Sequence, residues 1–353
     1  MIPLRGGLPL RVLVVDDSVF NRRSIGEILA QSPEIEVVGK AADGEEALRL
    51  VSSLKPDCIT LDLEMPRMDG FTFLRILMTK MPTPVVVVSS YSQKENVFKA
   101  LELGALDFVA KPERFSDPDL GGIREQLVSK VLLARSVRLG VPPPPRRADV
   151  SAPPVEPPKQ KQLVPPKSVI AIASSTGGPS ALMEIFTRFP VNYRSALVIA
   201  QHMPDKFTRT FADRLSRRGN LRVSEAQDQD VVSEGTGFVC PGRHCMELEV
   251  SARGTMKLKV GQPSERDRYV PSADRLLASV AAGVGRRAVG VILTGMGDDG
   301  VEGARRIIEA GGIVICESEE SAVVYGMPGA AVRAGAVTQS LPLTEIADYL
   351  AKL

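Results

Sequence analysis

Two long stretches of the chain alternate short apolar runs with amphipathic segments. In the first stretch, five apolar runs are candidate β-strands: Arg11–Val15, Ile35–Val38, Cys58–Leu61, Val85–Val88 and Asp107–Val109. Five helical patterns follow them in turn, near residues 18–31, 44–53, 70–80, 93–103 and 119–138. Regular alternation of strands and helices predicts an α/β domain, here a (βα)5 unit with helices on both faces of a parallel sheet.

The second stretch repeats this alternation. Its apolar runs are Val169–Ala173, Ala196–Ala200, Gly237–Val239, Val289–Leu293 and Ile313–Cys316. Its helical patterns lie near residues 178–189, 205–217, 272–284, 300–310 and 328–334. Residues 244–260 instead alternate apolar and polar positions around Gly254, which favours an antiparallel hairpin set in the sheet. We expect a doubly wound α/β domain with a mostly parallel sheet.

A proline-rich segment separates the two stretches. Residues 141–167 contain ten prolines, which remove amide donors and block helices. We therefore expect one domain over residues 1–140, an extended linker over 141–167 and a second domain over 168–353. The linker holds five Lys and Arg against two Asp and Glu. A solvated spacer is favoured over a binding role for it.

Composition excludes several classes of protein. The 353 residues are 44% hydrophobic, and no apolar run is long enough to span a bilayer, so we expect no membrane insertion. The net charge of +2 gives no basic footprint for nucleic acid. The N-terminus lacks the apolar core of a signal peptide. The four cysteines form no C-x-x-C pair, which indicates reduced thiols and a cytoplasmic location.

Five polar residues come at the ends of the strands predicted in the first stretch. Asp16 and Asp17 follow the first strand, Asp62 the third, Ser89 ends the fourth and Lys111 follows the fifth. Because the carboxyl ends of parallel strands share one edge, these side chains should lie together. Clustered carboxylates suit Mg²⁺, and a carboxylate beside Mg²⁺ is a candidate nucleophile toward a phosphoryl group. The alternative is a purely structural role, in which these residues only cap helices.

Residues 14–18 (VVDDS), 61–70 (LDLEMPRMDG) and 107–112 (DFVAKP) resemble the signature of response-regulator receiver domains. The resemblance implies that Asp62 accepts a phosphoryl group from a chemotaxis histidine kinase. It further implies that Asp17, Asp62 and the Glu64 carbonyl hold Mg²⁺, with Asp16 in support, and that Ser89 and Lys111 act as switch residues.

The second stretch carries a serine, a histidine and an acid at different strand ends. Ser174 and Ser175 precede Thr176 and two glycines after the first strand, and His202 follows the second. Asp299 lies in a glycine-rich loop after the strand Val289–Leu293. This set suits nucleophilic catalysis, whereas the glycine-rich turns alone also suit phosphate binding. However, no dinucleotide fingerprint or P-loop lysine is present.

Residues 174–179 (SSTGGP), 201–204 (QHMP), 293–300 (LTGMGDDG) and 324–328 (VYGMP) resemble the chemotaxis protein-glutamate methylesterase family, CheB. The resemblance implies Ser175 as nucleophile, His202 as base and Asp299 as acid. It places the Met296 amide in an oxyanion hole, in a site that also includes Thr176, and it implies no cofactor in the second domain.

The same resemblance implies the whole function. The chain would be a phosphorylation-controlled hydrolase that removes methyl esters from glutamyl residues of chemoreceptor cytoplasmic domains and deamidates glutamines. The receiver would cover the catalytic edge until Asp62 is phosphorylated. Two alternatives stay open: a phosphorylation-dependent binding module with an inactive hydrolase domain, and a receiver-controlled hydrolase of a non-receptor ester.

The sequence departs from the family pattern at four places. Ser174 stands where alanine is frequent, and Asp298 stands where asparagine is usual. A carboxylate at 298, if it lies beside His202, would raise the imidazole pKa and weaken a neutral base. Tyr269 begins a segment that starts with histidine in the family, and residues 316–318 (CES) replace Gln-Asp-Glu. These changes concern substrate contacts and leave the expected triad intact.

Overall fold

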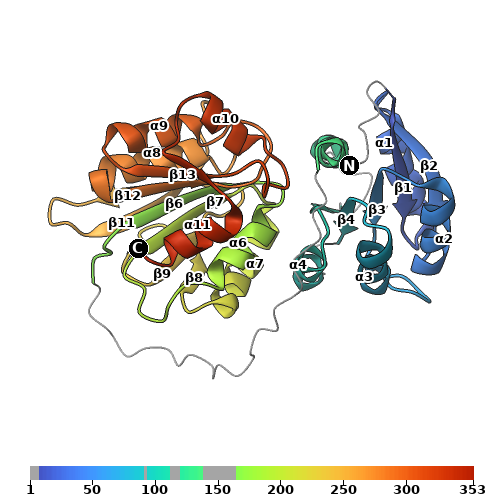
Figure 1. Ribbon diagram of the computed structural model, residues 1–353, viewed down its shortest axis with the longest axis horizontal. Helices are drawn as coiled ribbons and strands as arrows, with labels where there is room; N and C mark the ends of the chain where they lie inside the picture. Colours follow the sequence, from blue (N-terminus) through green and yellow to red (C-terminus); the bar gives the residue numbers. More distant parts are fainter. Residues whose placement is uncertain (1–7, 91–93, 112–119, 138–163) are drawn as a thin grey trace.

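The computed structural model describes residues 8–90, 94–111, 120–137 and 164–353, which form two parts (Figure 1). We call residues 8–137 the N-terminal part and residues 164–353 the C-terminal part. The predicted linker lies outside the described residues up to position 163. Its last four residues, 164–167, belong to the C-terminal part, where the Lys167 amide donates to the Arg194 carbonyl at 2.8 Å.

The N-terminal part is built on a five-stranded parallel sheet with the order β2-β1-β3-β4-β5. The strands are β1 (Leu10–Val15), β2 (Ile35–Ala41), β3 (Cys58–Leu61), β4 (Val85–Ser89) and β5 (Asp107–Ala110). The helices are α1 (Val19–Ala30), α2 (Gly44–Leu54), α3 (Gly70–Lys80), α4 (Lys94–Glu102) and α5 (Leu120–Leu132), which a short 3₁₀ turn, η2 (Leu133–Arg135), extends. This confirms the predicted (βα)5 fold.

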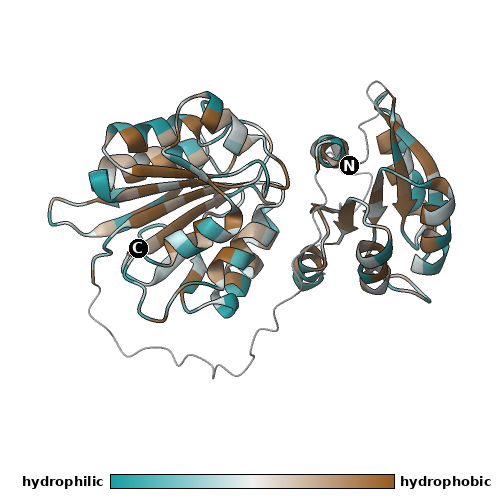
Figure 2. Ribbon diagram, in the orientation of Figure 1, coloured by the Kyte–Doolittle hydropathy of each residue, from teal (hydrophilic) through white to brown (hydrophobic). Residues whose placement is uncertain are grey.

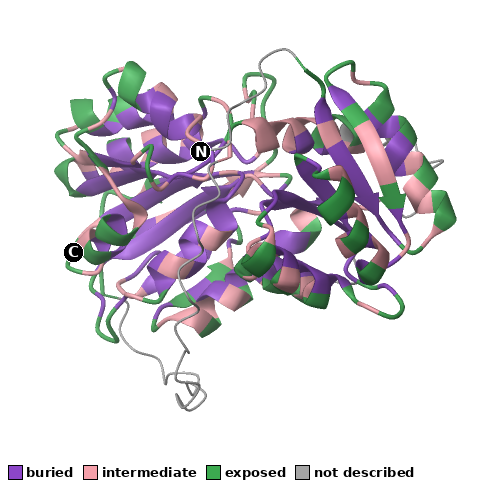
Figure 3. Ribbon diagram, turned by 45° about the vertical axis from the view of Figure 1, so that its right-hand side comes forward, coloured by how far each residue is buried: buried purple, intermediate pink, exposed green. Residues whose placement is uncertain are grey.

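Strands β1, β3, β4 and β5 are buried on both faces, which explains their apolar runs, whereas the edge strand β2 is partly exposed (Figure 3). Along β1, Val12 and Val14 face α1 and α5, whereas Leu13 and Val15 face the opposite core. Ser18 and Asp43 cap α1 and α2 by accepting hydrogen bonds from the third residue after each cap. The helices therefore start where the sequence predicts them.

The C-terminal part holds a seven-stranded, fully parallel sheet with the order β14-β13-β12-β6-β7-β9-β8. Its strands are β6 (Val169–Ser174), β7 (Ala196–Gln201), β8 (Arg222–Glu225), β9 (Thr236–Val239), β12 (Ala288–Ile292), β13 (Ile313–Glu317) and β14 (Gln339–Leu341). In Figure 2 its central strands are brown, the colour of apolar residues.

Helices cover both faces of this sheet, so the doubly wound α/β prediction is confirmed. On one face lie α8 (Ala273–Val284), which η3 (Gly285–Arg287) follows, α9 (Val301–Glu309) and α10 (Met327–Arg333). On the other lie α6 (Gly178–Phe186), α7 (Asp205–Arg218) and α11 (Leu343–Leu350). No helix of the described segments combines the length and the apolar character that crossing a bilayer requires.

The predicted hairpin forms, but outside the main sheet. Strands β10 (Cys245–Val250) and β11 (Met256–Gly261) pair antiparallel in a sheet of their own. Their apolar side chains, including Met246 and Leu258, join the core under α8. The expectation of a hairpin within the sheet was wrong, because the edge beside β9 is filled by the short parallel strand β8.

The two parts meet through α4 and β5 of the N-terminal part and α6 and α7 of the C-terminal part. Phe98 of α4 stacks on Phe211 of α7 with ring centroids 5.4 Å apart. Phe108 of β5 lies 4.6 Å from the ring of Phe207. All four rings are buried, and the apolar core is continuous from one part to the other.

Ion pairs surround these rings. Arg214 of α7 makes two contacts with Glu102 of α4, at 3.1 and 2.7 Å, and a third with Glu95 at 3.2 Å. Arg217 contacts Glu95 at 2.9 Å, and Arg218 also pairs with Glu102. The interface thus has an aromatic centre and a charged rim.

Candidate active site

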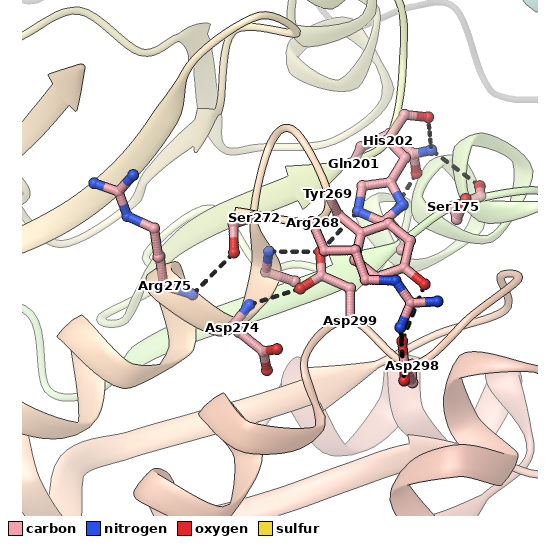
Figure 4. A network of polar contacts seen from close by, with 12 residues as sticks. Ser175, Gln201, His202, Arg268, Tyr269, Ser272, Asp274, Arg275, Asp298 and Asp299 are labelled. Atoms are coloured by element: carbon pink, nitrogen blue, oxygen red, sulfur yellow. Dashed lines mark hydrogen bonds and ion pairs between the residues drawn. The ribbon is translucent and has the colours of Figure 1, made fainter. Parts of the chain in front are cut away.

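Three adjacent strands of the C-terminal sheet carry the predicted catalytic residues. Ser175 directly follows β6, His202 directly follows β7, and Asp299 lies in the loop between β12 and α9. Since β12, β6 and β7 are neighbours and parallel, their carboxyl ends bring the three residues to one edge (Figure 4).

His202 and Asp299 form a hydrogen-bonded pair. The His202 Nε2–H donates to Asp299 Oδ2 at 2.8 Å, because a buried carboxylate can only accept. This bond leaves Nδ1 as the ring nitrogen available to a nucleophile. Asp299 also accepts the backbone N–H groups of Ala273 and Asp274 at 2.8 and 3.0 Å. These amides begin α8, so a helix N-terminus stabilises the buried charge of Asp299.

The backbone of Ser175 is fixed by hydrogen bonds on both sides. Its N–H donates to the Thr294 carbonyl at 3.1 Å, and its carbonyl accepts from Gln201 Nε2 at 2.9 Å. Ser174 Oγ in turn donates to Gln201 Oε1 at 2.7 Å. Ser174 therefore orients the glutamine that holds Ser175. Within the described residues, no hydrogen bond joins Ser175 Oγ to His202.

Two backbone N–H groups at this edge are available to an anion. Neither the Thr176 amide nor the Met296 amide donates to an acceptor in the part of the chain that the structure describes. The loop of Met296 approaches the serine closely at Gly295, where a Cβ atom would lie 2.7 Å from Ser175 Cβ. Glycine is needed at this position to leave that space.

A buried glutamate supports the same loop. Glu317 of β13 is 1% exposed and accepts the Thr294 N–H at 2.8 Å and the Ser321 hydroxyl at 3.1 Å. Burial raises the pKa of Glu317 from 4.5 to about 7, against the effect of these donors. Glu317 is thus a titratable group directly behind the loop that carries Met296.

A cavity of about 670 Å³ is lined in part by Asp299 and by Tyr269, whose ring stacks on His202. Asp298, Asp299 and Tyr269 line it on one side, and Arg268 and Arg333 are among the basic residues on its walls. Side chains of both charges therefore line this cavity together with one aromatic ring.

Asp298, one of the departures from the family pattern, turns away from the imidazole. Its carboxylate accepts from the Tyr269 hydroxyl at 3.0 Å and pairs with Arg268 at 3.3 Å. Its neighbour Asp299 points the other way, to His202 (Figure 4). Among the described residues, Asp298 therefore pairs with Tyr269 and Arg268, and Asp299 is the carboxylate that bonds His202.

The N-terminal part brings a second set of predicted residues together. Oxygen atoms of Asp16, Asp17 and Asp62 all lie within 4.8 Å of one another, and Lys111 Nζ is 2.5 Å from Asp62 and 2.8 Å from Asp16. Burial disfavours the ammonium of Lys111, but the carboxylates outweigh it and raise its pKa. Burial also raises the pKa of Asp62, against the effect of Lys111.

The two remaining residues of this set lie at the same edge. Ser89 ends β4 and is buried, and the Lys111 amide donates to its carbonyl at 2.8 Å. The side chain of Glu64 is exposed, two residues beyond Asp62. Three carboxylates from two neighbouring strands make an oxygen-rich site that fits Mg²⁺ in donor chemistry and spacing.

Sequence reasoning gave no role to Gln201 and Asp107. Gln201 ends a wholly apolar strand, and a polar residue there signals a need for buried partners. Asp107 accepts the Thr176 hydroxyl at 2.6 Å and pairs with Lys130 at 2.9 Å. The Thr176–Asp107 hydrogen bond joins the residue after Ser175 to the N-terminal part, and no local sequence pattern predicts it.

The sequence of this chain is similar to those of known protein families and of named relatives. Residues 170–350 match the CheB methylesterase family, and residues 12–118 match the response regulator receiver domain. A Myxococcus xanthus protein named protein-glutamate methylesterase/protein-glutamine glutaminase 1 is 46% identical and is aligned over 98% of this chain and 97% of its own length. A Pyrococcus abyssi relative of the same name, without the number, is 39% identical over 98% and 94%.

A solved structure is also similar. The CheB methylesterase catalytic domain of Thermotoga maritima shares 34% identity with this chain at a TM-score of 0.51. The match covers 52% of this chain and 97% of that domain. With a receiver domain, a methylesterase domain and full-length relatives of the same organisation, the chain belongs to the CheB family of receiver-linked protein-glutamate methylesterases.

Proposed function

We propose that this protein hydrolyses glutamyl γ-methyl esters, and deamidates glutamines, on the cytoplasmic domains of chemoreceptors. The observation that carries the proposal is the meeting of Ser175, His202 and Asp299 at the ends of three adjacent strands. The Thr176 and Met296 amides, which donate to no acceptor among the described residues, follow two of these strands. Relatives over the full chain are named for both activities.

In the proposed reaction, His202 Nδ1 takes the proton of Ser175 as its oxygen attacks the ester carbonyl. The Met296 and Thr176 amides stabilise the oxyanion of the tetrahedral intermediate. His202 then returns the proton to the methoxy oxygen, which leaves as methanol, or to the amide nitrogen, which leaves as ammonia when the substrate is glutamine. Water attacks the acyl-serine with His202 again as base, which releases glutamate. Asp299 keeps the imidazole in one tautomer and stabilises its charged form.

The receiver supplies the proposed control. Asp62 accepts a phosphoryl group from a chemotaxis histidine kinase, and Lys111 and Ser89 contact its oxygens. Asp17, Asp62 and the Glu64 carbonyl, with Asp16 in support, would hold Mg²⁺. When bound there, Mg²⁺ would offset the negative charge of the carboxylates and the phosphoryl group. We place this chemistry in the cytoplasm, in agreement with four buried free cysteines.

The contact between the two parts supports an inhibited resting state. Thr176, an oxyanion-hole residue in this proposal, is held by Asp107 of the receiver, and the aromatic cluster lies against α7. Ser175 has no hydrogen bond to His202 in this arrangement. We propose that phosphorylation weakens the docking and lets the site adjust around substrate.

Methanol release from a methylated receptor cytoplasmic fragment tests the function. Wild type and Ser175→Ala are compared, each with and without Mg²⁺ and a small phosphodonor. Release that needs Ser175 and rises with phosphodonor supports both the esterase and its control. A folded, phosphorylated wild type that releases no methanol would contradict the proposal. Labelling Ser175 with a serine-reactive probe then separates a hydrolase of another ester from a binding module.

A further inference from the structure

The imidazole of His202 lies against an aromatic ring. The rings of His202 and Tyr269 are nearly parallel, at 9°, with centroids 5.4 Å apart, which is an offset stack (Figure 4). Tyr269 is half-buried and belongs to a loop of irregular structure before α8. The hydrogen bond to Asp299 fixes one edge of the imidazole, and the tyrosine ring covers one of its faces.

The same tyrosine lies against the loop that carries the Met296 amide. Gly297 has a φ of +91°, and a Cβ atom there would lie 2.5 Å from Tyr269 Oη and 3.1 Å from Cζ. A side chain at this position would therefore displace the tyrosine. Tyr269 thus contacts both the base and the backbone next to the proposed oxyanion hole.

Two charged residues hold the tyrosine in place. Its hydroxyl donates to Asp298 Oδ1 at 3.0 Å, and the Arg268 guanidinium lies 5.2 Å from its ring centroid while it pairs with Asp298. Burial and the hydrogen bond to Asp298 both raise the pKa of the Tyr269 hydroxyl, which therefore remains a donor at neutral pH.

From this geometry we propose that Tyr269 is a positioning residue for the base. By stacking on the imidazole, it keeps His202 in the plane where Nε2 bonds Asp299 and Nδ1 faces the serine, and Asp298 and Arg268 anchor it. This inference rests on the proposed function, in which His202 is the base. It also gives Asp298 a role: its carboxylate secures Tyr269.

Three variants of the full chain separate the ring from the hydroxyl. Tyr269→Leu removes the ring, Tyr269→Phe keeps the ring, and Asp298→Asn keeps an acceptor for the tyrosine. The matched control is Tyr349→Leu. Tyr349 is a half-buried tyrosine on α11, which packs on the sheet face opposite α8. All are assayed for methanol release with phosphodonor present, after thermal unfolding has shown that each folds.

We expect Tyr269→Leu to lower kcat about 10- to 100-fold with KM changed less than about twofold, because a displaced base loses alignment but not substrate contacts. Tyr269→Phe keeps the stacked ring and Asp298→Asn keeps an acceptor for the hydroxyl, so we expect each to lower kcat by a smaller factor of up to about fivefold. A rise in KM alone would make Tyr269 only a wall of the cavity. The proposal would be overturned by that rise in KM alone or by unchanged kinetics in Tyr269→Leu. It would also be overturned if Tyr269→Phe lost as much kcat as Tyr269→Leu.

A spectroscopic test does not depend on activity. The chain has only two histidines, so the ring signals of His202 and His244 can be assigned by one substitution. The tyrosine ring should shift the His202 ring protons upfield in wild type and Tyr269→Phe but not in Tyr269→Leu, and the nitrogen shifts should show the Nε2–H tautomer. Absence of this signature in wild type would refute the stacking. An inactive wild type that shows it would refute the proposed function while supporting the position of Tyr269.

Discussion

The ion pair between Glu102 and Arg214 offers the sharpest test of inhibition by docking. Glu102 ends α4 on the receiver and Arg214 lies on α7, with side chains 25% and 18% exposed and two contacts between them. We consider the charge reversal Glu102→Arg. It removes the attraction to Arg214 and Arg218 and replaces it with repulsion, and it leaves the aromatic core of each part untouched.

The size of the effect follows from this geometry. Exposed ion pairs contribute about 0.2–1 kcal/mol, and a bidentate, partly buried pair lies at the upper end of that range. With the added repulsion, docking should weaken by about 1–2 kcal/mol. Since about 1.4 kcal/mol corresponds to a factor of ten, the undocked fraction should rise about 5- to 30-fold while docking still dominates.

The assay is methanol release from a methylated receptor fragment by the full chain without phosphodonor. The unstimulated rate should rise by the same 5- to 30-fold, and added phosphodonor should then stimulate less than it does in wild type. Arg218→Glu combined with Glu102→Arg should restore part of the inhibition. Glu36→Arg, on the exposed face of β2, is the control for charge alone.

One result would refute this reasoning. If the unstimulated rate of Glu102→Arg equals that of wild type and of Glu36→Arg, the contact between α4 and α7 does not restrain catalysis. The inhibition would then have to be sought elsewhere than in this docked arrangement.

Three further predictions concern single residues. Asp62→Asn should abolish stimulation by phosphodonor and leave the unstimulated rate unchanged, and stimulation that persists would contradict phosphorylation at this residue. Ser174→Ala should lower stability by about 1 kcal/mol, measured by denaturant unfolding, because Gln201 Oε1 loses its donor. The raised pKa of Glu317 means that stability present below pH 4.5 is lost as pH rises through about 7. Glu317→Gln should therefore flatten the fall in Tm of wild type between pH 5 and 8, and two parallel curves would exclude Glu317 as the cause.

Much of the site could be predicted from the sequence because parallel strands impose a common edge. Once β6, β7 and β12 are recognised as neighbours, Ser175 and His202 must emerge together. The hydrogen bonds of Asp299 were beyond such reasoning. Its donors Ala273 and Asp274 lie 26 and 25 positions earlier, and only the packing of α8 brings them there.

Other features depend on contacts that leave no local pattern. The edge strands β8 and β14 are short and half-exposed, so they lack the apolar runs from which central strands can be predicted. The bond between Thr176 and Asp107 joins residues that lie 69 positions apart. The direction of Asp298 was also open, because residue type fixes a charge but not the partner toward which a loop turns it.

The docking surface of the receiver has a thermodynamic consequence. Helix α4 and strand β5 face the catalytic part, so any protein that binds the receiver through that surface must compete with docking. By linkage, such a partner binds the undocked chain and raises its population in proportion to its own concentration and affinity. A protein that binds this face would thus activate the enzyme without phosphorylation. Conversely, phosphorylation would strengthen the binding of that protein by the factor by which it raises the undocked fraction.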